Sequence, residues 1–265
     1  MTTNRLPAPT ISRVIQALTP PPVRKALPDM SPTKRIFGLI LLAATTLPLD
    51  IATGFDTDYY HQRYGLNDPY QKRVDDRGNG YEPLYGVRNF REVLKGVLFR
   101  GGANNSYNRN GLRGNNNPLP QNGLANLCVA GFQTAIYLYS TNYSHAAPQT
   151  SCDSPSGKNT LHYSQMGYGS KSREILEMIH AAILNSALGP IYVHCWNGWH
   201  ASGFISALAL RQFCGVSGDD AVTYWIKNTD GDSNYPDHKK RIRDFAPYKD
   251  LMIDAQIQQR ICPQL

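Results

Sequence analysis

The sequence predicts an α/β fold in which a mostly parallel central sheet is flanked by helices. Short apolar runs alternate with amphipathic helical patterns along residues 89–265. The clearest run is Ile191-Tyr192-Val193, which is β-branched, apolar and preceded by Gly189-Pro190. Because strands that alternate with helices form parallel sheets covered on both faces, we expect ligands at the carboxyl ends of the strands.

Spacing and capping residues predict the elements in order. Residues 55–88 have no sustained period and predict an irregular N-terminal wrap with one short helix, ahead of a domain at 89–265. Within that domain we expect strands at 96–100, 134–139 and 160–163, and helices at 121–130, 170–183, 205–213 and 217–225. Residues 101–123 hold eight Asn and five Gly, which predicts a long exposed loop whose role the composition does not reveal.

Residues 1–54 have the pattern of an export segment. The apolar run 36–49 follows Lys34-Arg35 and precedes the small residues 52–54, as in a signal peptide. The run is short for a membrane span, which needs about 20 apolar residues, so an uncleaved membrane anchor is the alternative. Met30 is a candidate true start. We therefore expect an exported protein, periplasmic or secreted, that meets a membrane only through this segment.

The net charge of +7 does not indicate a nucleic-acid partner. Residues 1–54 hold six of the 27 Lys and Arg residues but two of the 20 acidic residues, so the rest of the chain is close to charge balance. No basic helix or aromatic-basic repeat is present. The expected partner is a phosphorylated or otherwise anionic substrate, with no cofactor, and the sequence says nothing of the oligomeric state.

The five cysteines suit an exported protein, in which disulfides persist. If Cys195 is a working thiol, Cys128, Cys152, Cys214 and Cys262 remain. Four cysteines allow three pairings, and the sequence does not choose among them.

The segment that carries the chemistry follows the strand at 191–193 directly. A tight loop and an amphipathic helix come next; the segment reads His194, Cys195, Trp196, Asn197, Gly198, Trp199, His200, Ala201, Ser202 and Gly203. Such a loop aims main-chain N–H groups inward while the helix adds its positive end, which together suit a phosphate-like dianion. The same field favours the thiolate of Cys195 as a nucleophile. A merely buried cysteine would not need the surrounding glycines.

This loop resembles the signature of the cysteine-based protein tyrosine and dual-specificity phosphatases. That signature is His-Cys, two residues, Gly, two residues, Arg, Ser or Thr, and Gly; His194, Cys195, Gly198, Ser202 and Gly203 match it. Residues 89–101 are similar to the opening strand of the atypical dual-specificity members. The resemblance implies that fold, phosphomonoester hydrolysis through a phosphocysteine, phosphate binding by residues 194–203, and a Ser202 hydroxyl that stabilises the departing thiolate. A helix N-cap is the alternative role of Ser202.

Two departures from the signature bear on activity. The arginine that grips two phosphate oxygens is replaced by Ala201, so His200 or Arg100 would have to substitute for it. The general acid is also missing from its usual place near 165–168, which leaves Asp153, His145 and His162 as candidates.

Other interpretations stay open. A pseudophosphatase would bind an anionic ligand without turnover, and a thiol enzyme could transfer sulfur or an acyl group. Trp196 and Trp199 would either line a pocket or pack. His194, Cys195, His200 and His162 could ligate a metal, but they lack the paired spacing of a structural zinc site, so no metal is expected. The basic run 238–241 is typical of a solvated face, with steering of an anionic substrate as the alternative.

Overall fold

The computed structural model describes residues 57–103, 118–140, 143 and 145–265. The expected export segment and most of the Asn-rich loop lie outside the described residues, so both stay predictions. Among the described residues, no helix combines the length and the apolar character that crossing a membrane requires.

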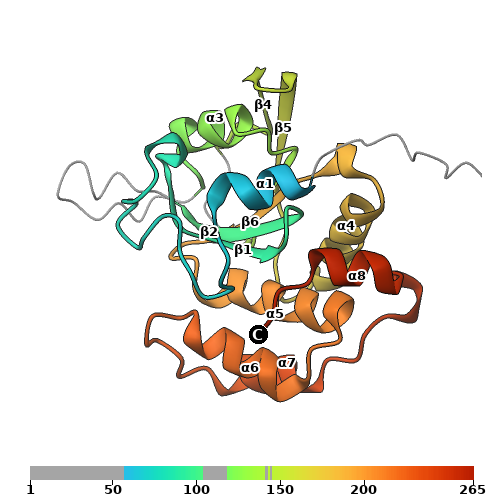
Figure 1. Ribbon diagram of the computed structural model, residues 1–265. Helices are drawn as coiled ribbons and strands as arrows, with labels where there is room; N and C mark the ends of the chain where they lie inside the picture. The colour runs from blue at the N-terminus through green and yellow to red at the C-terminus, as the bar shows by residue number, and fades with distance from the viewer. Residues whose placement is uncertain (1–56, 104–117, 141–142, 144) are drawn as a thin grey trace, which may run out of the picture. The chain divides into compact units, whose positions relative to one another are not determined.

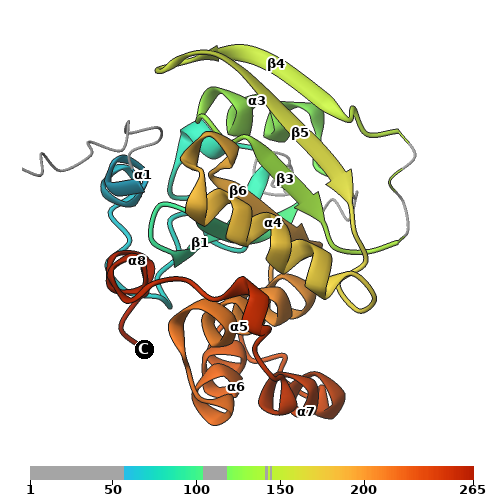
Figure 2. The same ribbon diagram turned by 90° about the vertical axis from the view of Figure 1, so that its right-hand side faces the viewer.

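A six-stranded sheet forms the centre of the described chain (Figures 1 and 2). Its order is β1 (Val87–Leu94), β2 (Leu98–Ala103), β6 (Ile191–Cys195), β3 (Thr134–Tyr137), β5 (Gly157–Gln165) and β4 (Gln149–Ser154). The four inner strands pair in parallel, and β1 and β4 pair antiparallel at the two edges. The predicted fold class, a mostly parallel sheet flanked by helices, is confirmed.

Helices cover the two faces of the sheet with separate apolar clusters. One cluster contains residues of α1 (Thr57–Tyr64) and α3 (Gln121–Val129), together with strand residues such as Phe99 and Tyr192. The other contains residues of α4 (Ser172–Leu184), α5 (His200–Cys214), α6 (Gly218–Lys227), α7 (Pro236–Asp244) and α8 (Ala255–Ile261). Short 3-10 turns occur at Glu82–Leu84, Ser186–Leu188 and Lys249–Leu251.

The helix α5 is central to the second face. Nearly all of its residues are buried, and it ends where Gly215 takes a left-handed φ of 64°, the C-terminal stop that glycine permits. Because α5 is fixed between the sheet and α6, its N-terminus is held directly after the carboxyl end of β6.

The strand β4 was not expected, because its Ser- and Pro-rich sequence reads as a loop. It pairs along its full length with β5 to form a hairpin at the sheet edge (Figure 2). A disulfide joins Cys152 of β4 to Cys128 of α3, and a second joins Cys214 of α5 to Cys262 after α8. Cys195 alone has a free thiol.

Candidate functional site

The candidate site is the turn that links β6 to α5. Cys195 ends the strand, its side chain is only 2% exposed, and α5 begins at His200. The Cys195 Sγ lies 3.5 Å from the Ser202 Oγ, within hydrogen-bond range for sulfur. The thiol and the hydroxyl therefore face each other at the base of the loop 196–199.

The main-chain carbonyl groups of this loop point toward β1 and β2, whose side chains supply hydrogen-bond donors. Arg88 donates from Nε and Nη2 to the Trp196 oxygen at 3.2 and 3.1 Å. Asn89 Nδ2 donates to the Asn197 oxygen at 2.6 Å. Arg100 Nη2 donates to the Gly198 oxygen and, at 3.0 Å, to the Trp199 oxygen. Each of the four carbonyl oxygens of the loop 196–199 thus accepts a hydrogen bond from a side chain of β1 or β2.

The N–H groups of the same segment behave in the opposite way. Among the described residues, no protein acceptor takes a hydrogen bond from the main-chain N–H of Trp196, Gly198, Trp199 or residues 200–202. The first N–H groups of a helix have no partner within the helix, and those of α5 add to the set. With the carbonyls held by β1 and β2, these unpaired donors, here called the nest, are a candidate site for an anion.

Close packing of backbone against backbone sets the height of the loop over β2. A Cβ on Gly102 would lie 2.5 Å from the Trp196 oxygen, and one on Gly198 would lie 2.6 Å from the Gly101 carbonyl carbon. Gly198 also has a φ of 79°, which disfavours any side chain. Glycine is required on both sides of this contact.

The His194 side chain is neutral, and its hydrogen bonds hold the end of β6 in place. Its Nε2 lies 2.8 Å from the Tyr163 hydroxyl, which also accepts the Leu119 N–H, and its Nδ1 lies 3.1 Å from the Cys195 oxygen. The Cys195 carbonyl can only accept, so Nδ1 carries the proton and Nε2 accepts from Tyr163. Complete burial lowers the pKa of His194 to about 3. The ring therefore orients the Cys195 main chain.

Three arginines of β1 and β2 are buried behind the loop: Arg88, Arg91 and Arg100. Among the described residues, the Nε and Nη1 atoms of Arg91 and Arg100 have no hydrogen-bond partner. Burial, followed by the charge of Arg100, lowers the pKa of Arg91 to about 10, while Asp230 opposes the shift. Asp230 Oδ1 accepts from Arg91 at 3.3 Å. The cluster carries more positive charge than Asp230 balances, and an anion in the loop would offset the excess.

His200 and Arg100, the expected substitutes for the missing arginine, both lie near Ala201. Ala201 is fully buried in the first turn of α5. Arg100 is near, but its Nη2 is directed to the loop carbonyls rather than into the nest. His200 Nε2 lies 2.7 Å from the Asp232 oxygen, and its ring packs on Tyr235 at a centroid distance of 4.1 Å. Neither side chain takes over the grip that the resemblance assigns to an arginine at 201.

The candidate acids are not brought to the loop. Asp153 pairs with Lys158 at the start of β5, and the Asp153 side chain is 77% exposed. Cys195 lies level with the other end of β5. His162 faces Thr134 at the start of β3 and is exposed. His145 is exposed in the connection before β4. The expectation that Asp153 serves the Cys195 site has no support in this geometry, because the edge hairpin carries it to the opposite end of the sheet.

The loop carries two aromatic side chains, Trp196 and Trp199. Trp196 is 41% exposed, donates from Nε1 to the Tyr137 hydroxyl at 2.9 Å, and packs against Tyr139 at 5.8 Å between ring centroids. Trp199 donates from Nε1 to Asp230 Oδ2 at 2.9 Å. Both tryptophan rings of the loop are thus held in place by a hydrogen bond from the indole N–H. Among the described residues, no group of three or more His, Cys, Asp or Glu could hold a metal ion.

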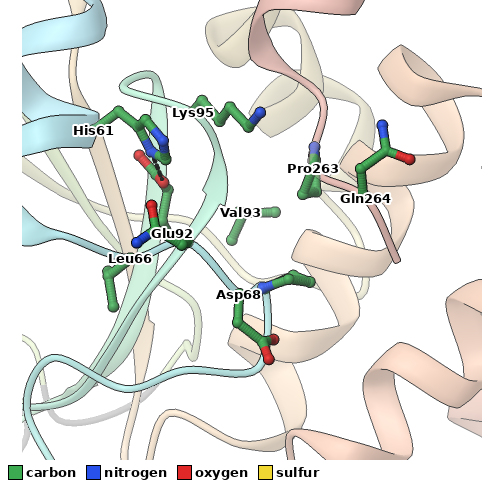
Figure 3. A pocket seen from close by; sticks show the side chains of 10 residues that line it. His61, Leu66, Asp68, Glu92, Val93, Lys95, Pro263 and Gln264 are labelled. Carbon is green, nitrogen blue, oxygen red and sulfur yellow. Dashed lines mark hydrogen bonds and ion pairs between the residues drawn. The ribbon is translucent and has the colours of Figure 1, made fainter.

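A second hollow lies elsewhere, beside α1 and the C-terminal residues (Figure 3). His61 Nδ1 approaches Glu92 Oε2 at 2.6 Å there, and the Gly96 N–H donates to Glu92 Oε1 at 2.7 Å. None of the residues of the Cys195 loop lines it.

Sequence reasoning missed the polar residues of β1 behind the loop: Arg88 and Asn89, which donate to its carbonyls, and Arg91, which pairs with Asp230. A signal was present, since two arginines stand among the apolar residues Val87, Phe90, Val93 and Leu94 of the segment 87–94. A charged residue in a fully buried strand indicates a polar partner nearby.

Fold and site together define a class: an α/β protein with a buried thiol where a parallel strand passes through a tight loop into a helix. No protein-family model matches the sequence, and no curated protein does. The solved structures to which the chain is similar include the following two. One is the core catalytic domain of the PP-IP phosphatase SIW14 from S. cerevisiae in complex with citrate, with 12% identity, a TM-score of 0.41, and coverage of 66% of this chain and 92% of that one. The other is a Siw14 catalytic core, with 13% identity, a TM-score of 0.38, and coverage of 64% and 88%.

Proposed function

We propose that this protein binds phosphate-type oxyanions in the loop 196–202 and hydrolyses phosphomonoesters through Cys195. The observation that carries the proposal is the thiol beneath a ring of main-chain N–H groups that have no acceptor among the described residues. Such donors stabilise charge on phosphoryl oxygens.

The reaction has two balanced steps. The Cys195 thiolate attacks phosphorus, an S–P bond forms, the ester P–O bond breaks, and the leaving oxygen takes a proton. Water then attacks the phosphocysteine, the S–P bond breaks, and inorganic phosphate departs. The Ser202 hydroxyl, 3.5 Å from Sγ, donates to the thiolate as it leaves in the second step.

Ala201 determines the rate of hydrolysis that we expect. A methyl group cannot hold two phosphoryl oxygens, and the loss of one preorganised donor costs roughly 10² to 10³ in rate. We therefore expect slow turnover rather than none, with the loop N–H groups doing most of the binding.

The second candidate function is oxyanion binding without turnover, and Ala201 is the residue that favours it. The two functions share the nest and differ in whether the S–P bond forms. A phosphorylated or anionic ligand is the partner in either case.

We further propose that the protein works outside the cytosol. Two disulfides join elements distant in sequence, which suits an oxidising compartment, and the apolar run 36–49 supplies a means of export. Detection of the mature protein in the periplasm or medium, with both disulfides formed, tests this; a reduced protein in the cytosol contradicts it.

The test of the proposed activity compares the oxidised wild-type protein with Cys195→Ser on phosphomonoesters, alongside titration with orthovanadate. Hydrolysis by wild type that Cys195→Ser abolishes, together with a trapped phosphocysteine detected by mass spectrometry, supports the enzyme. Vanadate binding without any turnover supports the binding function. Absence of both would refute the site.

A further inference from the structure

Tyr168 and His238 form a hydrogen-bonded pair that the reaction described above does not use. Tyr168 lies in the connection between β5 and α4, and His238 lies in the first turn of α7. The Tyr168 hydroxyl is 3.1 Å from His238 Nε2, and the two rings stack at a centroid distance of 5.5 Å. The pair joins two elements that are far apart in the sequence.

This pair lies beside elements that flank the Cys195 loop, namely the segment after β3 and the first turns of α5. The Tyr168 N–H donates to the Leu138 oxygen at 3.0 Å, and the Leu138 N–H donates to the His194 oxygen at 3.0 Å. Main-chain bonds thus tie the connection to the strand end that carries the thiol. The Tyr168 ring packs on Phe204, in the first turns of α5, and on Tyr139.

The charges around Tyr168 suit a group that gives up and regains a proton. Burial raises the pKa of Tyr168, Arg241 lowers it, and the neighbouring Cys195 and Tyr235 raise it. Arg241 is thus the cation available to a phenolate at this position, and it also donates to the Gly169 oxygen at 3.2 Å.

His238 is placed to direct the phenol proton. Burial, then the charges of His200 and Arg241, lower the pKa of His238, and Asp237 opposes them. The ring is therefore neutral at pH 7 and has one N–H. If that proton is on Nε2, His238 donates to the Tyr168 oxygen, and the Tyr168 O–H is free to turn toward a substrate in the loop.

We infer that Tyr168 donates the proton to the leaving oxygen of the ester, with His238 as the residue that positions it. This inference rests on the proposed function and fills a role for which Asp153 lies at the wrong end of the sheet. As the P–O bond breaks, the phenol proton moves to the leaving oxygen and a phenolate remains beside Arg241. In the second step the phenolate takes a proton from the attacking water, which restores Tyr168.

Tyrosine is a suitable donor only for a poor leaving group. An alkoxide is far more basic than a phenolate, so proton transfer from Tyr168 to an alkyl leaving group is downhill, and general acids of this kind contribute about 10² to 10⁴ in rate. A nitrophenolate leaves without protonation and gains little from the same donor.

The experiment measures hydrolysis of glycerol phosphate and of p-nitrophenyl phosphate by the full disulfide-bonded protein and its variants. Tyr168→Phe should reduce alkyl ester hydrolysis about 10²-fold and aryl ester hydrolysis by about threefold or less. His238→Leu should reproduce this split. His238→Gln, which keeps an N–H donor, should recover a large part of the alkyl activity. Tyr248→Phe, a hydroxyl deletion at a ring that covers Arg173, is the control and should leave both rates unchanged.

The results separate this inference from the proposed function. If wild type hydrolyses both esters and Tyr168→Phe slows them by the same factor, the hydroxyl is no acid and the inference fails while the proposed function stands. If wild type hydrolyses neither ester and forms no phosphocysteine, the proposed function fails and the inference fails with it.

Discussion

Replacing Gly102 by alanine tests whether the backbone contact between β2 and the Cys195 loop builds the anion nest. The added Cβ would lie 2.5 Å from the Trp196 oxygen and 2.7 Å from the Asn197 carbonyl carbon. Real Cβ atoms do not approach other atoms this closely, so the loop must move away from the strand. Overpacking of this kind costs about 1–3 kcal/mol of stability. A displacement near 1 Å at a reacting centre costs about 10²-fold in function.

The assay is orthovanadate titration, paired with urea unfolding on the same samples. For Gly102→Ala we expect a loss of about 2 kcal/mol in unfolding free energy and a vanadate affinity lower by about 10²-fold. The control is Gly157→Ala, in the β4–β5 turn, where φ is +113° and no atom lies within 4 Å of the added Cβ. Backbone strain alone should cost about 1–2 kcal/mol there and leave vanadate affinity unchanged.

The comparison is decisive because the two substitutions cost similar stability but differ in place. Vanadate binding by Gly102→Ala within about threefold of wild type would refute the reasoning. The nest would then not depend on the close backbone contact between β2 and the loop. Equal loss of affinity in Gly157→Ala would also refute it, because the effect would be one of general stability.

Three further predictions concern groups that support the site. Arg100→Met should weaken vanadate binding about tenfold or more, because it removes a charged donor worth about 1.5–3 kcal/mol from the loop carbonyls, whereas Arg91→Met, which bonds none of them, should have a smaller effect in the same titration. The pKa of His194 falls from 6.5 to about 3 on folding, so its contribution to stability is fully present above pH 6.5 and is lost as pH drops toward 3; unfolding of His194→Gln should therefore depend less on pH across that window. Joint replacement of Cys214 and Cys262 by serine opens a link across 48 residues and should cost about 4 kcal/mol in urea unfolding; a cost below about 1 kcal/mol would contradict the role of this bridge.

The strand, the loop and the helix around Cys195 could be predicted because local signals agree there. An apolar β-branched run predicts β6, a helical apolar pattern ended by Gly215 predicts α5, and the residues between them are too few for anything but a tight turn. When strand, turn and helix are contiguous, their geometry follows from spacing alone.

The rest of the site depends on pairing between distant segments, which spacing does not encode. Arg100 reaches the loop because β2 lies beside β6, across about 90 residues of chain, and Arg88 reaches it from β1, which pairs with β2. Asp153 was a candidate acid because it follows β3 in sequence, but its antiparallel strand returns it to the far end of β5. The pairing of the cysteines was open for the same reason, since only the fold brings α5 next to α8.

Under the proposed function, the buried arginines explain how a loop without its own guanidinium can bind an anion. Arg100 is fully buried, and a charge in that position is costly unless something opposes it. Its bonds to the Gly198 and Trp199 carbonyls polarise peptide groups of the loop, which strengthens these peptides as dipoles pointing into the nest. The positive charge therefore acts on the ligand through the backbone from behind. Such an arrangement can hold an oxyanion in place, but it cannot follow the phosphoryl oxygens as they move in the transition state, which is why binding should survive the alanine at 201 better than rate does.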